Sequence, residues 1–187
     1  FRNNYVKSNK GCLIHAEKIR SKPQIEDNII DSITLNNSFL ISISHNLGEI
    51  ELTNNTFSHI TTTGSTNANC GGSGLSLSSS LSDYTIKFYR CKFYDIANNQ
   101  ETTPNCHGGA LQYGMSTDFS ANIELEECEF KRNAVKGGQG GGIAIRTSKS
   151  VTIRGCVFES NTANKDYSSS SLLFNNHYEE KGKGFGG

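Results

Sequence analysis

The stretch that decides the fold is Asn122–Phe158, NIELEECEFKRNAVKGGQGGGIAIRTSKSVTIRGCVF, because its end repeats its beginning. Two patterns occur twice in it, first as Ile123-x-Leu125 with Cys128-x-Phe130 and then as Val151-x-Ile153 with Cys156-x-Phe158. A glycine-rich turn and a short alternating segment, Ile143–Ile145, lie between the two copies. Self-similarity of this kind is the sequence signature of stacked repeats. The unit holds two short strands and no helix, so the stretch predicts an all-β fold of stacked repeats.

Five segments of the chain follow this pattern and end on a phenylalanine. Within each segment apolar residues alternate with polar ones, as they do in a strand that buries one face. Aligned on the phenylalanine, the segments are 33–39, 50–57, 86–93, 123–130 and 151–158. Stacking them in this register predicts two inward apolar columns, one of Ile50, Ile86, Ile123 and Val151 and one of Leu52, Phe88, Leu125 and Ile153.

Charged residues on the outer side of the predicted strands favour the same register. Lys87 falls between Glu51 and Glu124 when the repeats are stacked. Three more pairs of opposite charge become neighbours, namely Arg90 with Glu127, Lys92 with Glu129 and Glu126 with Arg154. An exposed pair contributes only about 0–1 kcal/mol. Opposite charges on adjacent strands nevertheless indicate correct pairing.

A second alternating segment follows most of the connecting loops and predicts a second strand in each repeat. These segments are 12–16, 40–44, 75–79, 110–113, 143–145 and 172–174. Runs of glycine precede three of them, at 71–72, 108–109 and 140–142. Glycine adopts left-handed backbone conformations that a Cβ would oppose, so we expect tight corners there. Polar loops, clearest at 61–69 and 98–105, supply the variable length.

The composition favours a thin, elongated core over a round globule. Of the 187 residues, 34% are hydrophobic, none is Trp, and the mean hydropathy is −0.49. Lys plus Arg and Asp plus Glu both number 18, so the charge indicates no nucleic-acid partner. No apolar run is long enough to span a membrane. We expect one domain over residues 1–187 and, because both ends fall within a repeat, a segment or subunit of a longer assembly.

Cys91, Cys128 and Cys156 hold the same inward position, two residues before the repeated phenylalanine. They could form a metal site or a redox pair, or they could be small buried residues of the stack. Three thiols in one column give poor tetrahedral geometry, and no histidine falls in register. We therefore favour buried residues and predict no metal and no cofactor.

Cys70 and Cys106 are arranged differently, since each stands just before a Gly-Gly corner in successive repeats. The separation of the repeats is compatible with the Cα distance of a disulfide. We favour a disulfide between them over two free thiols, and such a bridge would imply an oxidising compartment. Cys12 has no partner in this scheme.

Asn36 and Asn54 each begin an Asn-x-Ser/Thr sequence, which is the acceptor for N-glycosylation in secreted proteins. In the predicted alignment both hold one outward position, three residues before the phenylalanine. We predict that both are glycosylation sites. The alternative is that asparagine stands there because it tolerates the backbone of a corner. Asn37 and Asn55 come next and are predicted to bond backbone groups inside the turn.

No group of residues indicates catalysis. A polysaccharide lyase or hydrolase needs convergent carboxylates or a carboxylate-bound Ca²⁺. The carboxylates here fall mostly in the outer charge pattern, and Asp83, Asp95 and Asp118 lie in separate loops without a shared repeat position. The five histidines are dispersed, and the run GGQGGG lacks the Lys-Ser/Thr of a phosphate-binding loop. We therefore predict a protein that is not an enzyme.

Two short motifs resemble the repeats of polymorphic outer-membrane proteins. The Phe-x-x-Asn half is seen in Phe130-Lys-Arg-Asn133 and Phe158-Glu-Ser-Asn161, and the Gly-Gly-Ala-Ile half in Gly108-Gly109-Ala110-Leu111 and Gly141-Gly142-Ile143. Earlier repeats have Ile60 and Ile96 where the motif has asparagine. The resemblance implies the right-handed parallel β-helix of that family and of the wider pectin-lyase-like class. It also implies a surface-exposed, adhesive or structural role.

These observations predict a single-stranded, right-handed parallel β-helix of about six coils. Bare strand edges at the ends of such a stack invite pairing, and neither end of the sequence contains a recognisable capping helix. We therefore predict an extracellular structural protein that forms a surface layer, stalk or filament by end-to-end stacking of copies and carries N-linked glycans. A surface adhesin or carbohydrate-binding module that uses the loop face is the alternative. A polysaccharide lyase or hydrolase ranks third.

Overall fold

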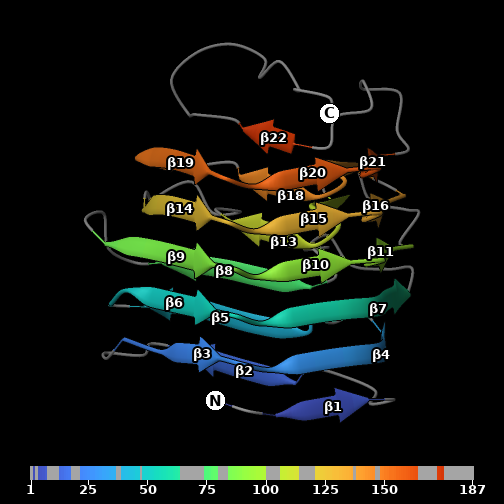
Figure 1. The fold of residues 1–187 in the computed structure, drawn as a ribbon, viewed down its shortest axis with the longest axis horizontal. Helices are drawn as coiled ribbons and strands as arrows, with labels where there is room; N and C mark the ends of the chain where they lie inside the picture. Colours follow the sequence, from blue (N-terminus) through green and yellow to red (C-terminus); the bar gives the residue numbers. More distant parts are fainter. Residues whose placement is uncertain are drawn as a thin grey trace.

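The structure of the chain, a computed structural model, is all-β, and its sheets are parallel (Figure 1). It describes residues 2, 4–7, 13–17, 22–36, 39–46, 48–63, 74–79, 84–99, 106–113, 121–136, 138–145, 148–163 and 172–174. No helix occurs among these residues. The all-β class that the alternating pattern predicts is therefore confirmed.

Three sheets hold most of the strands. The five-stranded sheet consists of β3 (Gln24–Glu26), β6 (Ile50–Thr53), β9 (Thr85–Tyr89), β14 (Asn122–Glu126) and β19 (Ser150–Arg154). The nine-stranded sheet consists of β1 (Tyr5–Lys7), β4 (Ile29–Asn36), β7 (Thr56–Thr63), β10 (Lys92–Tyr94), β11 (Ala97–Asn98), β15 (Glu129–Lys131), β16 (Ala134–Val135), β20 (Val157–Glu159) and β21 (Thr162–Ala163). The six-stranded sheet consists of β2 (Ile14–Glu17), β5 (Ile41–Asn46), β8 (Leu75–Ser79), β13 (Leu111–Tyr113), β18 (Ile143–Ile145) and β22 (Leu172–Phe174). A short pair is formed by β12 (Cys106–His107) and β17 (Gly138–Gln139).

The chain visits the sheets in a fixed order, so strands from each sheet together form a layer. From β3 the chain passes to β4 and then to β5, and the following strand, β6, pairs with β3. Figure 1 shows the layers stacked from β1 at one end to β19 and β20 near the other. We call β1 and β2 the first layer and β19 to β22 the last layer. The second strands predicted from the sequence, from 12–16 to 172–174, correspond to the six-stranded sheet.

The register of the later layers agrees with the predicted alignment. Strand neighbours are Ile50, Ile86, Ile123 and Val151 in one column and Leu52, Phe88, Leu125 and Ile153 in the next. The repeated phenylalanines stack, with ring centroids 5.1 Å apart for Phe57 and Phe93, 4.6 Å for Phe93 and Phe130, and 5.1 Å for Phe130 and Phe158. Outside, Lys87 lies between Glu51 and Glu124 as predicted. In-register stacking thus places an apolar core inside and charges outside.

The predicted alignment of segment 33–39 is wrong. The observed strand partners are Ile25 with Leu52, Ile30 with Phe57 and Ile33 with Ile60. The segment that matches 50–57 is therefore 23–30, and Phe39 lies beyond the end of β4. Ile25 and Ile30 are buried in the positions that later layers fill with leucine and phenylalanine. An alignment made on phenylalanine misses them because isoleucine fills the same apolar volume.

Two corners recur along the stack, each formed by a residue with a φ of 50–60°. The first corner is formed by Asp27, Asn54, Arg90, Glu127 and Gly155, and the second by Ser32, His59, Asp95, Arg132 and Ser160. Asn55 follows the first corner, is buried, and donates to the carbonyls of Ile25 and Thr53, as predicted for a turn asparagine. In the layer before it the same position is held by Asn28. The predicted equivalent, Asn37, lies outside the described residues.

Glycines form a third corner before the strands of the six-stranded sheet. Gly108 and Gly140 have φ values of 68° and 71°, which confirms the left-handed corners predicted at these two Gly-Gly runs. A Cβ on Gly109 would lie 1.9 Å from the carbonyl oxygen of Gly141. The backbones of neighbouring layers therefore approach too closely for any side chain there. The run at 71–72 lies outside the described residues.

Candidate functional site

The outer face of the five-stranded sheet carries a shallow groove of about 230 Å³. It is lined by Lys22, Glu49, Ile50, Glu51, Thr85, Lys87 and Glu124. Lys22 Nζ forms an ion pair with Glu51 and lies 3.5 Å from Glu49 Oε2. The hydrogen bond from Lys22 holds the pKa of Glu51 below its usual value. A carboxylate kept ionised suits the binding of a polar ligand better than it suits proton donation.

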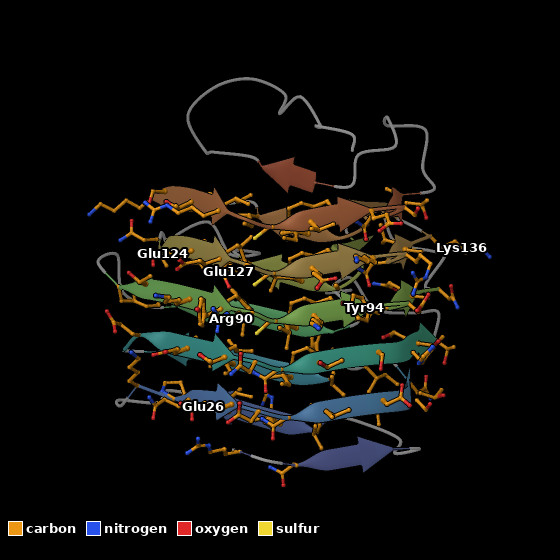
Figure 2. All side chains as sticks on the ribbon, in the orientation of Figure 1. Glu26, Arg90, Tyr94, Glu124, Glu127 and Lys136 are labelled. Atoms are coloured by element: carbon orange, nitrogen blue, oxygen red, sulfur yellow. The ribbon has the colours of Figure 1, made fainter. Side chains whose placement is uncertain are left out.

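Ion pairs continue across the layers at the first corner. Arg90 Nε lies 2.7 Å from Glu127 Oε2 in the next layer, and Figure 2 shows the two side chains at adjacent levels of the stack. The Arg90 guanidinium also lies 4.6 Å from the ring centroid of Tyr89. The predicted pairing of Arg90 with Glu127 is confirmed. Lys22 was not predicted because no repeated motif contains it.

A row of polar side chains that we call the second-corner row crosses four layers. It consists of Asp31, His59, Asp95 and Arg132. His59 Nδ1 lies 2.7 Å from Asp31 Oδ1, and its Nε2 lies 3.8 Å from Asp95 Oδ2. Arg132 donates two hydrogen bonds of 2.7 Å to the carboxylate of Asp95. The row links successive layers by charge on the outside of the corner.

That Asp83, Asp95 and Asp118 share no repeat position stays a prediction, but Asp95 does hold a repeated corner that the sequence analysis did not identify. Asp95, His59 and Arg132 each stand two residues after the repeated phenylalanine and occupy equivalent corners. Extending the alignment two residues past the phenylalanine would have found the row. Asp83 and Asp118 lie outside the described residues.

Hydrogen bonds from His59, Ser58 and Ser32 lower the pKa of Asp31 to about 2. Because this folded-state pKa is lower than that of an unfolded aspartate, the ionised carboxylate stabilises the fold above about pH 4. That contribution is lost as the pH falls from about 4 to about 2. The Asp31 side chain is 21% exposed and His59 is 64% exposed, so solvent screening reduces the contribution.

Replacing Asp31 with asparagine is expected to flatten the acid branch of the stability profile. Between pH 5 and pH 2, the wild-type protein should lose about 1 kcal/mol more unfolding free energy than Asp31→Asn. Urea unfolding at a series of pH values measures this difference. Ser58→Ala, which removes one donor to Asp31, should give an intermediate profile. Identical profiles for all three proteins would contradict the lowered pKa of Asp31.

The three cysteines that share one column are free thiols. Cys91 and Cys128 are buried, and Cys156 in the last layer is partly buried. The thiol of Cys91 lies 3.3 Å from the carbonyl oxygen of Leu52, and the Cys128 N–H donates to Cys156 Sγ over 3.4 Å. Among the described residues, no group of three His, Cys, Asp or Glu side chains could hold a metal ion. These contacts suit residues that bond the backbone inside a corner.

The predicted disulfide between Cys70 and Cys106 stays a prediction. Cys70 and Cys12 lie outside the described residues, and Cys106 is described only as part of β12, opposite Gly138. The polar loops predicted at 61–69 and 98–105 begin too early, because residues 61–63 belong to β7 and Asn98 to β11. Residues 64–69 and 100–105 lie outside the described residues.

The two predicted glycosylation sites are both exposed but do not share a repeat position. Asn36 ends β4 and lies opposite Thr63, whereas Asn54 forms the first corner and donates from Nδ2 to Asp27 Oδ1 over 3.2 Å. The predicted equivalence of the two is wrong because it rested on the alignment of 33–39. Their use as glycosylation sites stays a prediction.

The last layer is the second candidate site, because the part of the chain that the structure describes leaves one edge of β19 and β20 open. Among the described residues, β19 pairs only with β14 and β20 pairs only with β15. Ile153, inward in register, is 37% exposed, and Val157, on the outer face, is 43% exposed. Equivalent inward residues in the preceding layers are buried. The outward position of Val157 is also held by Ile29, which is 50% exposed within the stack, so only the exposure of Ile153 distinguishes the last layer. Among the described residues, this layer is therefore paired on one side only and leaves Ile153 accessible, which the sequence pattern alone did not locate.

No family model, curated protein or solved structure matches the chain. Within the described part of the chain, no helix is long and apolar enough to cross a membrane. The function must therefore be argued from the groove, the second-corner row and the open edge.

Proposed function

We propose that the three sheets are faces of one single-stranded, right-handed parallel β-helix of about six coils. The fixed order in which the chain visits the sheets and the in-register pairing along the stack support this arrangement. Connections between parallel strands of one sheet are right-handed in about 98% of cases. The two Phe-x-x-Asn motifs, which resemble those of β-helical outer-membrane repeats, end at the second corner.

On this fold we propose an extracellular structural protein, without enzymatic activity, that stacks end to end into a surface layer, stalk or filament. The observation that carries the proposal is the edge of the last layer, where, among the described residues, β19 and β20 are each paired on one side only and the inward Ile153 is accessible. Unpaired edges of this kind favour strand addition. The exposure of Asn36 and Asn54 is compatible with N-linked glycans on the flank of such an assembly.

The assembly is tested with Ile153→Lys. Ile153 is 37% exposed in the last layer, so the variant should fold. A lysine at this inward position would have to bury its charge under an added layer, which opposes strand addition. Sedimentation velocity over a range of concentrations is expected to show growing oligomers for the wild type and smaller ones for the variant. Thr34→Lys, on an exposed strand position away from the edge, is the matched control. A wild type that stays monomeric at high concentration would overturn the proposal.

The groove on the five-stranded sheet favours a second function, that of a surface adhesin or carbohydrate-binding module. Its paired lysines and glutamates offer hydrogen-bond donors and acceptors suited to a polyhydroxy ligand. Glycan-array binding that is lost in Lys87→Ala and kept in Lys136→Ala, where Lys136 is an exposed residue just after β16, would support this function. An array that shows no binding would contradict this second function.

A further inference from the structure

Three thiols stand above one another just after the first corner. The strand register places Cys91 beside Cys128 and Cys128 beside Cys156. The N–H of Cys128 donates to Cys156 Sγ over 3.4 Å, and all three cysteines are free thiols in the structure. Neighbouring parallel strands lie about 4.8 Å apart. This spacing falls within the Cα separations of about 4.4–6.8 Å that disulfides span.

Any disulfide within this column must include Cys128. Cys91 and Cys156 are two layers apart, at roughly twice the spacing of neighbouring strands. That separation exceeds the limit of about 7 Å beyond which two cysteines cannot be bridged without backbone movement. Because Cys128 can bond to one sulfur at a time, the column holds at most one disulfide.

The contacts of the two outer thiols favour Cys156 as the partner. Cys91 is fully buried and its thiol donates to two carbonyls, the nearer being that of Leu52 at 3.3 Å. Asn55 Nδ2 approaches the same sulfur to 3.9 Å from the layer before. Among the described residues, the thiol of Cys156 donates to one carbonyl, that of Arg154, over 3.4 Å. Oxidation of Cys91 therefore removes more buried hydrogen bonding, and the loss of a buried partner costs free energy.

The residue before Cys156 gives that cysteine more freedom than its counterparts have. The corner position is held by Arg90 and Glu127 in the two preceding layers and by Gly155 in this one. The nearest atom that a Cβ on Gly155 would meet, Glu127 Cγ, is 3.6 Å away, so close packing does not require glycine there. Glycine relaxes the backbone, which lets Cys156 bring its Cβ from the strand spacing to the about 3.8 Å of a disulfide.

We propose that Cys128 and Cys156 form a disulfide between the layers of β14 and β19, and that Cys91 remains a thiol. The oxidant is a small disulfide such as oxidised glutathione. One cysteine thiolate attacks it and expels a first small thiol, and the other cysteine thiolate attacks the mixed disulfide and expels a second. The two cysteines lose two protons and two electrons, which leave with the two small thiols. The exchange takes place during folding, because Cys128 is buried in the finished stack and buried thiols are inert.

The bridge ties the layer of β19 and β20 covalently to the core of the stack. A disulfide stabilises a fold mainly by constraining the unfolded chain. Bridges of this kind persist in oxidising compartments, which agrees with the extracellular location proposed above. The bridge lies between two described layers of one chain, so it does not depend on stacking between copies.

Disulfide mapping of the full chain tests this pairing. The protein is refolded in a mixture of oxidised and reduced glutathione, and its remaining thiols are alkylated in denaturant. Digestion after Lys, Arg and Glu puts the three cysteines on different peptides. In the monomer, mass spectrometry should find Cys128 linked to Cys156 about tenfold more often than to Cys91, as expected from one lost hydrogen bond. The same chain oxidised in urea should lose this preference, because loop closure alone distinguishes the two pairs weakly.

Three serine variants separate the roles of the cysteines. Cys91→Ser keeps both partners and should keep the linked peptide, whereas Cys128→Ser should leave Cys91 and Cys156 as free thiols. Cys156→Ser should melt about 5 °C below wild type under oxidising conditions and close to wild type under reducing conditions. Circular dichroism checks that each variant is folded, and the wild-type map decides the pairing if one is not.

Two results would overturn the proposal. One is a wild type in which Cys128 is alkylated as a free thiol or is linked mainly to Cys91. The other is a bridge between Cys91 and Cys156 in folded Cys128→Ser, which would contradict their separation by two layers.

Discussion

Replacing Phe93 with alanine is expected to lower the free energy of unfolding by about 3–5 kcal/mol. Phe93 is fully buried between Phe57 and Phe130, with ring centroids 5.1 and 4.6 Å away. It also meets Phe88 edge-on, at a centroid distance of 6.3 Å. Removing the ring deletes contacts with two layers at once and leaves a cavity that in-register strands cannot close. Urea or thermal unfolding measures the loss.

Phe158→Ala is the matched control, because the same column ends there. Phe158 stacks on Phe130 alone, at 5.1 Å, and is only partly buried. We expect about half the destabilisation of Phe93→Ala, since transfer and cavity costs both grow with burial. Equal losses for the two variants would contradict the description of the last layer as open.

The second large effect is expected for Asn133→Leu, which should lower the free energy of unfolding by about 1–3 kcal/mol because a buried backbone N–H loses its acceptor. Asn133 is fully buried at the second corner. Its Oδ1 accepts from the N–H of Ile96 over 3.1 Å, and its Nδ2 donates to the carbonyl of Phe93 over 3.0 Å. Leucine fills a similar volume but leaves the N–H of Ile96 without this acceptor and removes the donor to the Phe93 carbonyl.

Asn99→Leu provides the comparison, because Asn99 is exposed beyond the end of β11. The unfolding free energy of the Asn99→Leu variant should stay within about 0.5 kcal/mol of wild type, as is usual for surface changes. Chemical denaturation of both variants under one set of conditions makes the comparison. If leucine is tolerated at 133 as well as at 99, the asparagine contacts do not hold the corner. In the two layers before it the equivalent residues are Ile60 and Ile96, which are buried. An apolar side chain therefore fits this corner, and the expected loss comes from the missing hydrogen bonds and not from poor packing.

Much of the stack could be predicted because the spacing of the strands is strict. Side chains alternate with a period of two, so a shift of one residue would turn the apolar columns outward. Ile123 with Val151, and Glu124 with Lys87, fix the register of three layers from sequence alone. The same reasoning identified the left-handed corners at Gly108 and Gly140.

The first repeat and the sites were harder to predict for physical reasons. Core packing requires apolar volume and not a particular residue. Ile30 therefore fills the position that Phe57 holds in the next layer, and an alignment on phenylalanine misses it. The second-corner row arises because corner residues of different types, such as His59 and Asp95, are brought together by stacking. The open edge depends on which strands lack a neighbour, and a repeat pattern does not encode that.

Cryo-electron microscopy of the concentrated, intact protein tests end-to-end stacking most directly. The account predicts rods in which the strand spacing of about 4.8 Å continues across every junction between copies. With about six layers in each copy, the axial repeat should be roughly 29 Å. Discrete particles one copy long, with the edge of β19 and β20 covered, would contradict it.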